Sequence, residues 1–472
     1  MMVMGRLVDK SSFGIFALAS VVIAMTQIFA EFGFGPALVQ KDNIRQEHIN
    51  FAFLGATGVG LLLMLGLVLS SYFISAFYEG KVSAEMIQVM SLNLVFSTLG
   101  SASRSLLIRE LKFDKLFWAN GLSYVIGNLI IGIYLAWQGY EEWALIVGLL
   151  AGNLLASLFY LIFRPLNFRF SFTKENTKDI LHYGVGLTGV QLFSQLAHQV
   201  DKLLLGKVLP LDFLGSFERA QRIQGMPLMY AGKSIDGILF SLMSKLNNEK
   251  SRLQGFYFPF LSMIAIGMIY LSVIVFFFAG DIIRFLLGPG WDQAISIIKV
   301  MTCLIFIQTF SRFGDTFIRA TRAFKVSSIV KILFLLSIVF FIPLGYWLHG
   351  IYGAIGGIVL ANVVHAVSML VTCIRLGDYS IKQFIWLLLP VLVLGILLII
   401  KNTILFRFLP NDFPIKVLTV GFTDLLLFLG YYKYPSMIGK NNAEFISRML
   451  KDTRPISKII SWLDVIVKKN RR

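Results

Sequence analysis

The chain has 472 residues, of which 57% are apolar and only 15% are charged. Glycine adds 40 residues to the apolar share, which then lies well above that of soluble domains. A soluble protein of this size could not bury so much apolar surface, which argues against soluble enzymes and nucleic-acid-binding proteins. The net charge of +17 therefore points to cytoplasmic loops and lipid headgroups. The two cysteines, Cys303 and Cys373, lie in apolar runs and form no disulfide or zinc framework.

Segments with few or no charges are long enough to cross a membrane, which takes about 20 helical residues. The least charged stretches are 11–30, 49–78, 116–140, 143–163, 183–200, 256–280, 351–374 and 383–400. Further helical patterns that carry a few charges lie at 84–108, 212–243, 292–318, 326–348 and 412–432. The sequence thus predicts an all-α membrane protein with thirteen spans and short loops.

The loops differ in charge in a way that orients the chain. If alternate loops are assigned to two sides, one side holds several times more Lys and Arg than the other. Basic loops face the cytoplasm, so the basic tail 433–472 is predicted to be cytoplasmic. In this tail, apolar and basic residues alternate, which is typical of an amphipathic helix on the inner leaflet or of a disordered basic end.

A short N-terminal pattern recurs at a constant offset of 201 residues. Its first copy contains Gly5, Gly14, Phe16 and Ala19, and its second copy contains Gly206, Gly215, Phe217 and Ala220. A second, weaker repeat has an offset of 210 residues. The same residue types occur at Gly80, Phe96, Ser101, Ile108 and Arg109 and at Gly290, Phe306, Ser311, Ile318 and Arg319. We therefore expect two halves related by an axis along the membrane normal. They form an N-terminal bundle over 1–182 and a C-terminal bundle over 183–376, followed by two additional helices over 383–432.

The repeat also predicts a missing segment. In the second half, the repeated pattern follows a full span, 183–205, whose counterpart would precede Met1. We expect a late start site or a truncation, with fourteen spans in the intact protein and the first largely missing here. The alternative is that the first half never had this helix.

No enzyme signature is present: the sequence has no phosphate-binding lysine loop, no H-E-x-x-H and no G-x-S-x-G. The informative residues are cations within the predicted spans, where a charge is costly unless it faces water or a partner. They are Arg104, Lys202, Arg219, Arg222, Lys233, Lys299, Arg312, Lys331 and Lys416.

Helical spacing places polar residues on common faces of four helices. One face carries Gln308, Arg312, Asp315, Arg319 and Arg322, and another carries Arg219, Arg222, Tyr230 and Lys233. The other two carry Thr188, Gln191, Gln195, His198 and Lys202, and Asn93, Ser97, Ser101 and Arg104. Four such faces predict a shared aqueous cavity that is cationic and binds a bulky anionic solute.

The candidate substrate-binding residues are Arg104, Lys202, Arg219, Arg222, Lys233, Arg312 and Arg319. Candidates for ion coupling or gating are Glu31, His198, Asp201, Asp236 and Asp315. Simpler roles are also open: the arginines near span ends can extend to the interface, and the aspartates can neutralise nearby cations. We expect no cofactor or metal, with a H⁺ or Na⁺ gradient as the candidate driving force.

Several motifs resemble those of a transporter family. The segment Phe32–Gln40, after Glu31, resembles the acidic-L-G-small-G-x-A-L-V-Q segment of bacterial polysaccharide flippases. Arg6-Leu7-Val8 through Phe13-Gly14 is similar to the family's turn, although Asp9-Lys10 stands where Ser-Pro is usual. Asp201–Gly206 with Leu214–Ala220 resembles the matching stretch of the second half. These flippases of lipid-linked oligosaccharides belong to the multidrug/oligosaccharidyl-lipid/polysaccharide exporter superfamily.

The resemblance implies two six-helix bundles around a central cavity, plus two C-terminal helices. It implies a flippase in the inner membrane that moves undecaprenyl-pyrophosphate-linked repeat units to the periplasmic face by alternating access. Membrane lipids and the polymerase and chain-length proteins of the same pathway are the expected partners, and nucleic acid is not.

Other readings stay open. They are a drug/cation antiporter of the same fold, a peptidoglycan-precursor flippase and a membrane scaffold. A repeat-unit polymerase would need a large periplasmic loop, which the sequence lacks.

Overall fold

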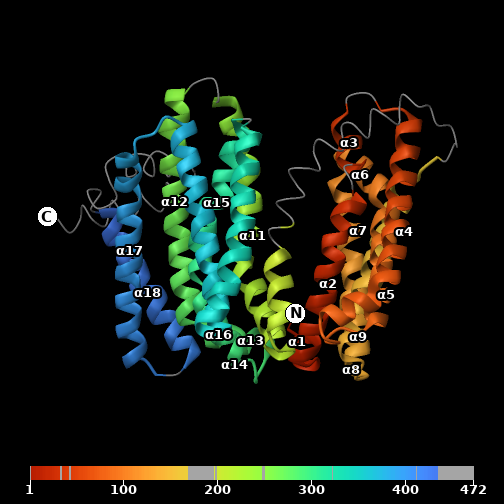
Figure 1. The fold of residues 1–472 in the computed structure, drawn as a ribbon. Coiled ribbons are helices and arrows are strands. Elements are labelled where there is room, and N and C mark those ends of the chain that lie inside the picture. Colours follow the sequence, from red (N-terminus) through yellow and green to blue (C-terminus); the bar gives the residue numbers. More distant parts are fainter. Residues whose placement is uncertain are drawn as a thin grey trace. The chain divides into compact units, whose positions relative to one another are not determined.

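The computed structural model describes residues 2–31, 34–41, 44–167, 196, 199–246, 250–321, 323–410 and 412–433. All regular elements in this part of the chain are helices (Figure 1). Seven of them are long and apolar enough to cross a membrane, or eight if the bent pair Asp292–Met301 and Cys303–Ala320 is one span. The all-α membrane fold is therefore confirmed, while thirteen spans stays a prediction.

The helices of the first part of the chain are α1 (Met4–Leu7), α2 (Lys10–Glu31), α3 (Phe34–Gln40), α4 (Gln46–Phe77), α5 (Ala84–Leu99), α6 (Ser101–Arg109), α7 (Phe113–Tyr124), the π-helix η1 (Val125–Ile131), α8 (Gly132–Trp137) and α9 (Glu141–Phe163). A further helical segment covers 199–208. The predicted span 84–108 is two helices, because the chain bends at Gly100 between α5 and α6.

The remaining helices are α11 (Leu211–Leu246), α12 (Lys250–Phe277), α13 (Ala279–Leu287), α14 (Asp292–Met301), α15 (Cys303–Ala320), α16 (Phe324–Leu376), α17 (Ile381–Phe408) and α18 (Phe413–Lys433). Helix α16 is two helices joined by a turn, since His349 and Gly350 have non-helical backbone angles and Gly350 has a φ of 59°. This turn separates the predicted spans 326–348 and 351–374. The predicted span 183–200 lies almost entirely outside the described residues.

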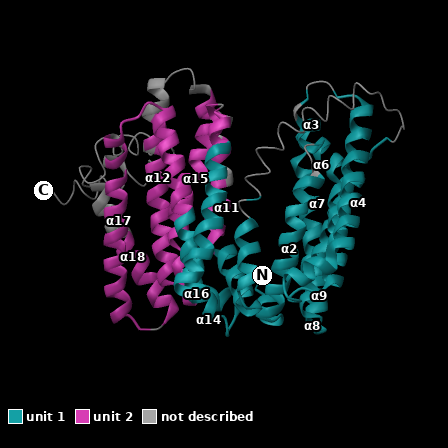
Figure 2. Ribbon diagram, viewed as in Figure 1, with its two compact units in different colours: residues 1–223, 282–298, 328–361 teal, residues 224–281, 299–327, 362–472 magenta. Residues whose placement is uncertain are grey.

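Contacts divide the chain into two compact units (Figure 2). Unit 1 comprises residues 1–223, 282–298 and 328–361, and unit 2 comprises 224–281, 299–327 and 362–472. The predicted bundle boundaries stay predictions.

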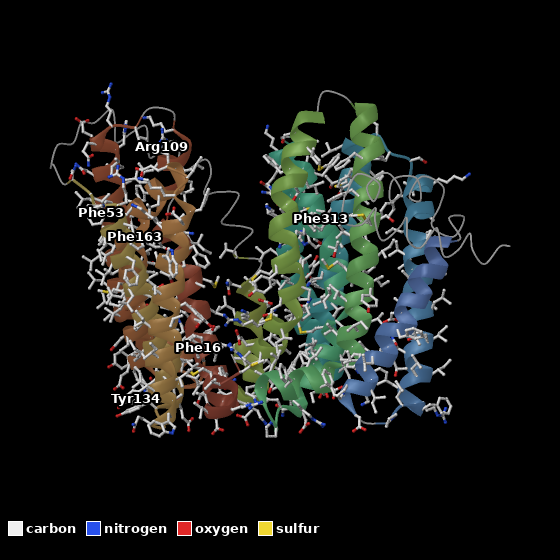
Figure 3. The ribbon with its side chains drawn as sticks, turned by 180° about the vertical axis from the view of Figure 1, so that it is seen from behind. Phe16, Phe53, Arg109, Tyr134, Phe163 and Phe313 are labelled. Carbon is white, nitrogen blue, oxygen red and sulfur yellow. The ribbon has the colours of Figure 1, made fainter. Side chains whose placement is uncertain are left out.

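In unit 1, helices α2, α4, α5, α7 and α9 pack side by side (Figure 1). Glycine allows η1 and α9 to approach closely, because a Cβ on Gly127 would come 2.3 Å from the backbone nitrogen of Gly152. Arg109 lies near one end of this bundle and Tyr134 near the other (Figure 3). The predicted orientation makes the Arg109 end cytoplasmic.

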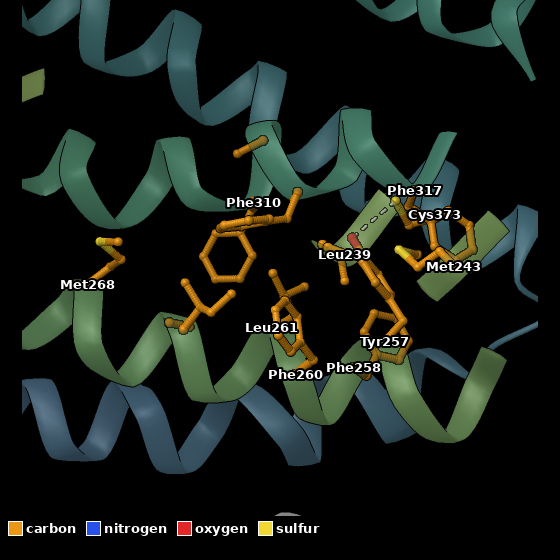
Figure 4. Close-up of a cluster of buried hydrophobic side chains, with 14 of the residues drawn as sticks. Leu239, Met243, Tyr257, Phe258, Phe260, Leu261, Met268, Phe310, Phe317 and Cys373 are labelled. Carbon is orange, nitrogen blue, oxygen red and sulfur yellow. Dashed lines mark hydrogen bonds between the residues drawn. The ribbon is translucent and has the colours of Figure 1, made fainter. Parts of the chain in front are cut away.

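Unit 2 has an aromatic core made by α11, α12, α15 and α16 (Figure 4). Tyr257 is fully buried there, and its ring centroid lies 4.6 Å from that of Phe317. Its hydroxyl donates to the sulfur of Cys373 over 3.5 Å, so the polar atom that accompanies this large ring has a partner. The core holds α15 in place, and α15 carries one of the predicted polar faces.

Candidate functional site

The two copies of the repeated pattern contact each other within unit 1. A Cβ on Gly14 would come 2.2 Å from the carbonyl oxygen of Leu211, and a Cβ on Gly215 would come 2.0 Å from that of Lys10. Because Gly215 and Leu211 follow Gly14 and Lys10 by the same 201 residues, the two contacts are equivalent and reciprocal. Reciprocal contacts of this kind are what a two-fold axis produces.

A second reciprocal pair joins side chains to helix ends. The indole nitrogen of Trp291 donates to the carbonyl oxygen of Gly5 over 3.1 Å. The ammonium of Lys81 donates to the carbonyl of Gly206 over 3.2 Å, and to those of Lys207 and Leu209 over 3.0 Å each. Lys81 follows Gly80 and Trp291 follows Gly290. Because the two glycines are equivalent in the weaker repeat, the two side chains occupy equivalent positions. Both satisfy carbonyls that a helix end leaves without partners.

The backbone before these two side chains is also equivalent. Gly80 has a φ of 75° and Gly290 a φ of 87°, which is a region that glycine enters at little cost. We call Lys81, Trp291 and the carbonyls that they bind the reciprocal latch. It joins the two repeats within unit 1, at the end of the first bundle that the predicted orientation makes periplasmic.

Two of the predicted cations in unit 1 have no counter-ion in the part of the chain that the structure describes. Among the described residues, neither the guanidinium of Arg104 nor the ammonium of Lys202 has a hydrogen-bond or ion-pair partner. Arg104 is exposed and Lys202 half-buried. The neighbouring Asp201 is buried, and its carboxylate accepts from Gln221 over 3.0 Å. Unpaired cations of this kind are available to an anionic ligand.

Arg219 and Arg222 differ although they share one predicted face. The side chain of Arg219 is only 5% exposed, pairs with Glu218 and lies over the ring of Phe13, 4.4 Å from its centroid. The side chain of Arg222 is 55% exposed, and its guanidinium lies 3.9 Å from the Glu218 carboxylate. Arg219 therefore has a packing role inside unit 1, whereas Arg222 is accessible.

In unit 2, α15 and α11 are joined by an ion pair. The Arg312 guanidinium contacts the Asp236 carboxylate at 2.7 and 2.8 Å, and the Thr316 hydroxyl donates to the same carboxylate over 3.1 Å. Gly232 makes room for this arrangement, because a Cβ there would come 2.4 Å from Nε of Arg312. The pair is half-buried, with 28% of the Arg312 side chain and 20% of Asp236 exposed.

The same face of α15 continues to Asp315 and Arg319. Arg319 contacts the Asp315 carboxylate at 3.1 Å and donates to the hydroxyl of Thr316 over 3.1 Å. Ser327 donates to the other oxygen of Asp315 over 3.2 Å. The structure therefore brings together Arg312, Asp236, Asp315 and Arg319 in one polar network within unit 2.

Some predicted residues cannot be placed. His198, Arg322 and most of the polar face that begins at Thr188 lie outside the described residues, as do the side chains of Glu31 and Lys233. The shared cavity of four polar faces therefore stays a prediction.

Sequence reasoning missed three features. Lys81 and Trp291 were not singled out, although their position after the repeated glycines was a usable signal. The predicted span 383–400 ends one residue before Lys401, which lies within α17 and pairs with Asp424 of α18. A lone acid inside an otherwise apolar stretch was the signal for Asp424.

Comparisons with known proteins give the family and the fold. Residues 3–296 match the model of a family described as polysaccharide biosynthesis protein. The chain is 22% identical over 401 residues to the lipopolysaccharide biosynthesis protein WzxC of Escherichia coli, covering 82% of this chain and 79% of that one. It is 22% identical over 321 residues to the teichuronic acid biosynthesis protein TuaB of Bacillus subtilis, covering 66% of each.

Among solved structures, the lipid II flippase MurJ in an inward closed conformation superposes with a TM-score of 0.73 at 19% identity. The match covers 93% of this chain and 96% of MurJ, so the two share a fold. The chain is a multi-pass bacterial membrane protein.

Proposed function

Because this chain belongs to the polysaccharide biosynthesis protein family, we propose that it flips a lipid-linked oligosaccharide across the cytoplasmic membrane. The proposed substrate is an undecaprenyl-pyrophosphate-linked repeat unit of a surface polysaccharide, moved from the cytoplasmic to the periplasmic face by alternating access. Polymerase and chain-length proteins of the same pathway are the proposed downstream partners, and the C-terminus is proposed to be cytoplasmic.

The observation that carries the proposal is the pair of helix cations, Arg104 and Lys202, for which the described residues supply no counter-ion. A cation is costly within a bilayer, so a pair of them without partners needs a compensating anion. A pyrophosphate supplies that charge and several acceptor oxygens, while the lipid tail stays in the hydrocarbon layer.

The polar network of unit 2 supplies an arginine that is held in place by an ion pair, unlike Arg104 and Lys202. The Arg312 guanidinium is held by the Asp236 carboxylate, which also accepts from the Thr316 hydroxyl, so it is fixed rather than free. A fixed guanidinium binds phosphate oxygens with less loss of side-chain entropy than a flexible lysine. We propose that Lys202 and Arg104 neutralise the head group in unit 1, and that Arg312 and Arg319 are phosphate-binding groups of unit 2.

Closing one end of the transporter is the proposed role of the reciprocal latch. Alternating access requires that the end opposite the entry side be shut while substrate binds. The latch joins the two repeats through a small number of hydrogen bonds to helix ends, and such contacts break without unfolding either helix.

The test is complementation of a strain that lacks its own oligosaccharide flippase. The chain is expected to restore surface polysaccharide and to clear lipid-linked repeat units from the inner leaflet. Lys202→Met is expected to lower transport about 10–100-fold, as for the loss of one charged hydrogen bond. Lys382→Met, which changes an exposed lysine at the start of α17, is the matched control. Full complementation by Lys202→Met would contradict the proposed head-group site.

A second candidate function is the flipping of a peptidoglycan precursor, which the fold likeness to the lipid II flippase MurJ favours. Expression in a strain depleted of its lipid II flippase separates the two functions. Rescue of growth there, without rescue of surface polysaccharide, would favour the precursor.

A further inference from the structure

One turn in the middle of the span Phe113–Trp137 is a π-helix rather than an α-helix. In η1, the backbone N–H of Gly132 donates to the carbonyl oxygen of Gly127, which lies five residues earlier instead of four. A turn closed in this way holds one residue more than an α-helical turn. Such turns are rare and are frequent at functional sites, so the extra residue needs an explanation.

The extra residue aligns two pairs of glycines whose spacings differ. Gly127 and Gly132 are five residues apart, whereas Gly148 and Gly152 on α9 are four apart. An α-helix returns to the same face after three or four residues but not after five. In η1 both glycines nevertheless face α9: a Cβ on Gly127 would come 2.4 Å from the Cα of Gly152, and a Cβ on Gly148 would come 3.2 Å from that of Gly132. We call the contact of these four glycines the glycine seam.

An all-α form of the same segment would disrupt the glycine seam. The residue four positions after Gly127 is Ile131, which would then take the place of Gly132. At that place, even a Cβ would lie 3.5 Å from the carbonyl oxygen of Ala144 and 3.6 Å from Cε of Met4. The rest of an isoleucine side chain has no space there, so α8 would have to move away from α9.

The part of the span that can turn is α8. On the other side of η1, α7 is held to α9, because the Tyr160 hydroxyl donates to Asn120 over 2.7 Å. In the described part of the chain, no side-chain hydrogen bond joins α8 to another helix. Loss of the π-turn would therefore rotate α8 by about 100°, which is the angle of one residue in an α-helix.

The observed register also leaves a polar group without a partner. The side chain of Asn128 in η1 is half-buried, and its amide has no hydrogen-bond partner among the described residues. The amide lies against the glycine seam, since a Cβ on Gly152 would come 2.9 Å from its Nδ2. An unsatisfied amide within a membrane span is unfavourable, so it lowers the stability of the π-turn register relative to another.

A rotation of α8 acts on the reciprocal latch through α1. Helix α8 contacts α1 within unit 1 (Figure 1), and α1 contains Gly5, whose carbonyl accepts from Trp291. Helix α1 is separate from α2, because Val8 between them has an extended backbone. The start of α2 is bound to α9, since the Ser12 hydroxyl donates to the Glu141 carboxylate over 2.7 Å. Helix α1 can therefore follow α8 while α2 stays in place.

We propose that η1 is a two-state register switch that controls the reciprocal latch. In the π state, α8 packs on α9 through the glycine seam, and α1 presents the carbonyl of Gly5 to Trp291. In the α state, Ile131 enters the seam, α8 and α1 move away from α9, and this hydrogen bond breaks. The switch itself needs no substrate. Its role in transport rests on the proposed function, in which the latch closes one end of the transporter.

Deletion of Ile130 tests the extra residue. The side chain of Ile130 is 59% exposed, and its removal brings Gly127 and Gly132 to a spacing of four residues, so an all-α helix then keeps the glycine seam. This variant is expected to fold and to unfold in detergent at or above the temperature of the wild type. Deletion of Leu69, which is 83% exposed in the α-helix α4, is the control. It is expected to destabilise the protein, because all later residues of α4 turn by about 100°. Equal destabilisation by the two deletions would overturn the proposal.

Thiol labelling at Val8→Cys, in a protein without its native cysteines, tests the link to the latch. Deletion of Ile130 fixes α8 on α9 and is expected to slow labelling. Gly132→Ile blocks the packing of the π state and is expected to speed labelling roughly fivefold, as for the loss of one hydrogen bond of the latch. Gly121→Ile on α7, where a Cβ meets nothing within 4 Å, is the control and is expected to label like the parent protein.

The outcomes separate the switch from transport. Unchanged labelling after both the deletion of Ile130 and Gly132→Ile would overturn the proposal. The labelling assay contains no substrate, so the expected labelling rates without flipping in any sample would contradict the proposed function and leave the register switch standing.

Discussion

Gly14 and Gly215 occupy equivalent positions of the two repeats, and each lies against the backbone of the helix that carries the other. Neither position has room for a side chain. A methyl group on either glycine would lie far inside the contact distance of a carbonyl oxygen, so the two helices would have to move apart.

We predict that Gly14→Ala and Gly215→Ala each destabilise the protein by about 1–3 kcal/mol, as overpacking does. Their effects are expected to be similar because the two contacts are equivalent. Thermal unfolding in detergent measures the change. Gly58→Ala on α4 is the control, because a Cβ there meets nothing within 4 Å. Unchanged stability of both variants would contradict the close approach of the repeats.

The latch can be weakened at its hydrogen bonds. Trp291→Phe keeps an aromatic ring, shortens the side chain and removes the donor to the carbonyl of Gly5, and the lost hydrogen bond alone is worth about 1 kcal/mol or roughly a fivefold shift in the open population. Lys81→Met removes three hydrogen bonds and is expected to have the larger effect. The measurement is thiol labelling at Val8→Cys, a position that is 4% exposed, after replacement of the native cysteines. Labelling rates equal to those of the parent protein would exclude a role in closure.

The position of Arg312 depends on a glycine in the neighbouring helix. Gly232→Ala is expected to push the guanidinium away from Asp236 and to lower transport about as much as Arg312→Gln does. Gly225→Ala, on the same helix but with open space around its Cβ, is the control and is expected to leave transport unchanged. Equal flipping rates in proteoliposomes for Gly232→Ala and Gly225→Ala would show that the ion pair has no role in transport.

A pH-dependent contribution to stability is expected at the Arg109 end of unit 1. The Lys112 ammonium and then the Arg164 guanidinium lower the pKa of the Glu110 carboxyl in the connection after α6. A lowered pKa means that the folded state favours the charged form. The contribution is therefore present above the ordinary value of 4.5 and is lost as the pH falls through the lowered value.

Glu110→Gln tests this contribution. At neutral pH, the variant is expected to be less stable than the wild type by roughly 0.2–1 kcal/mol, since solvent screens the pair. The difference is expected to vanish in acid. Unfolding midpoints of the two proteins over a pH series measure it, with Glu79→Gln as a control at an exposed carboxylate. A constant difference at all pH values would contradict the assignment.

The sequence predicted the all-helical fold well, because helix formation in an apolar chain depends on local composition. Apolar runs such as 143–163 become helices almost residue for residue, since a bilayer requires helical backbone. The offset that links Gly14 to Gly215 also marks an actual contact. Glycine at both positions of the repeat could be read as a sign of this contact, because only glycine lets two backbones approach so closely.

The candidate site was less predictable, since helical spacing gives the direction of a side chain but not its neighbours. Arg219 and Arg222 share a predicted face, but Glu218 and the ring of Phe13 bury the first and leave the second accessible. The pairing of Lys401 with Asp424 likewise depends on how two helices pack. Spacing along one helix cannot contain that information.

The two repeats bind each other through the reciprocal latch as two identical subunits would bind across a two-fold axis, but here both partners belong to one chain. In a symmetric dimer every contact occurs twice with identical chemistry, whereas a duplicated chain can alter each copy on its own. Here one copy has become a charged lysine that holds three carbonyls, and the other an indole that holds one. Salt and neighbouring charges therefore act on only one arm, so the two halves of this ancestral interface need not release together.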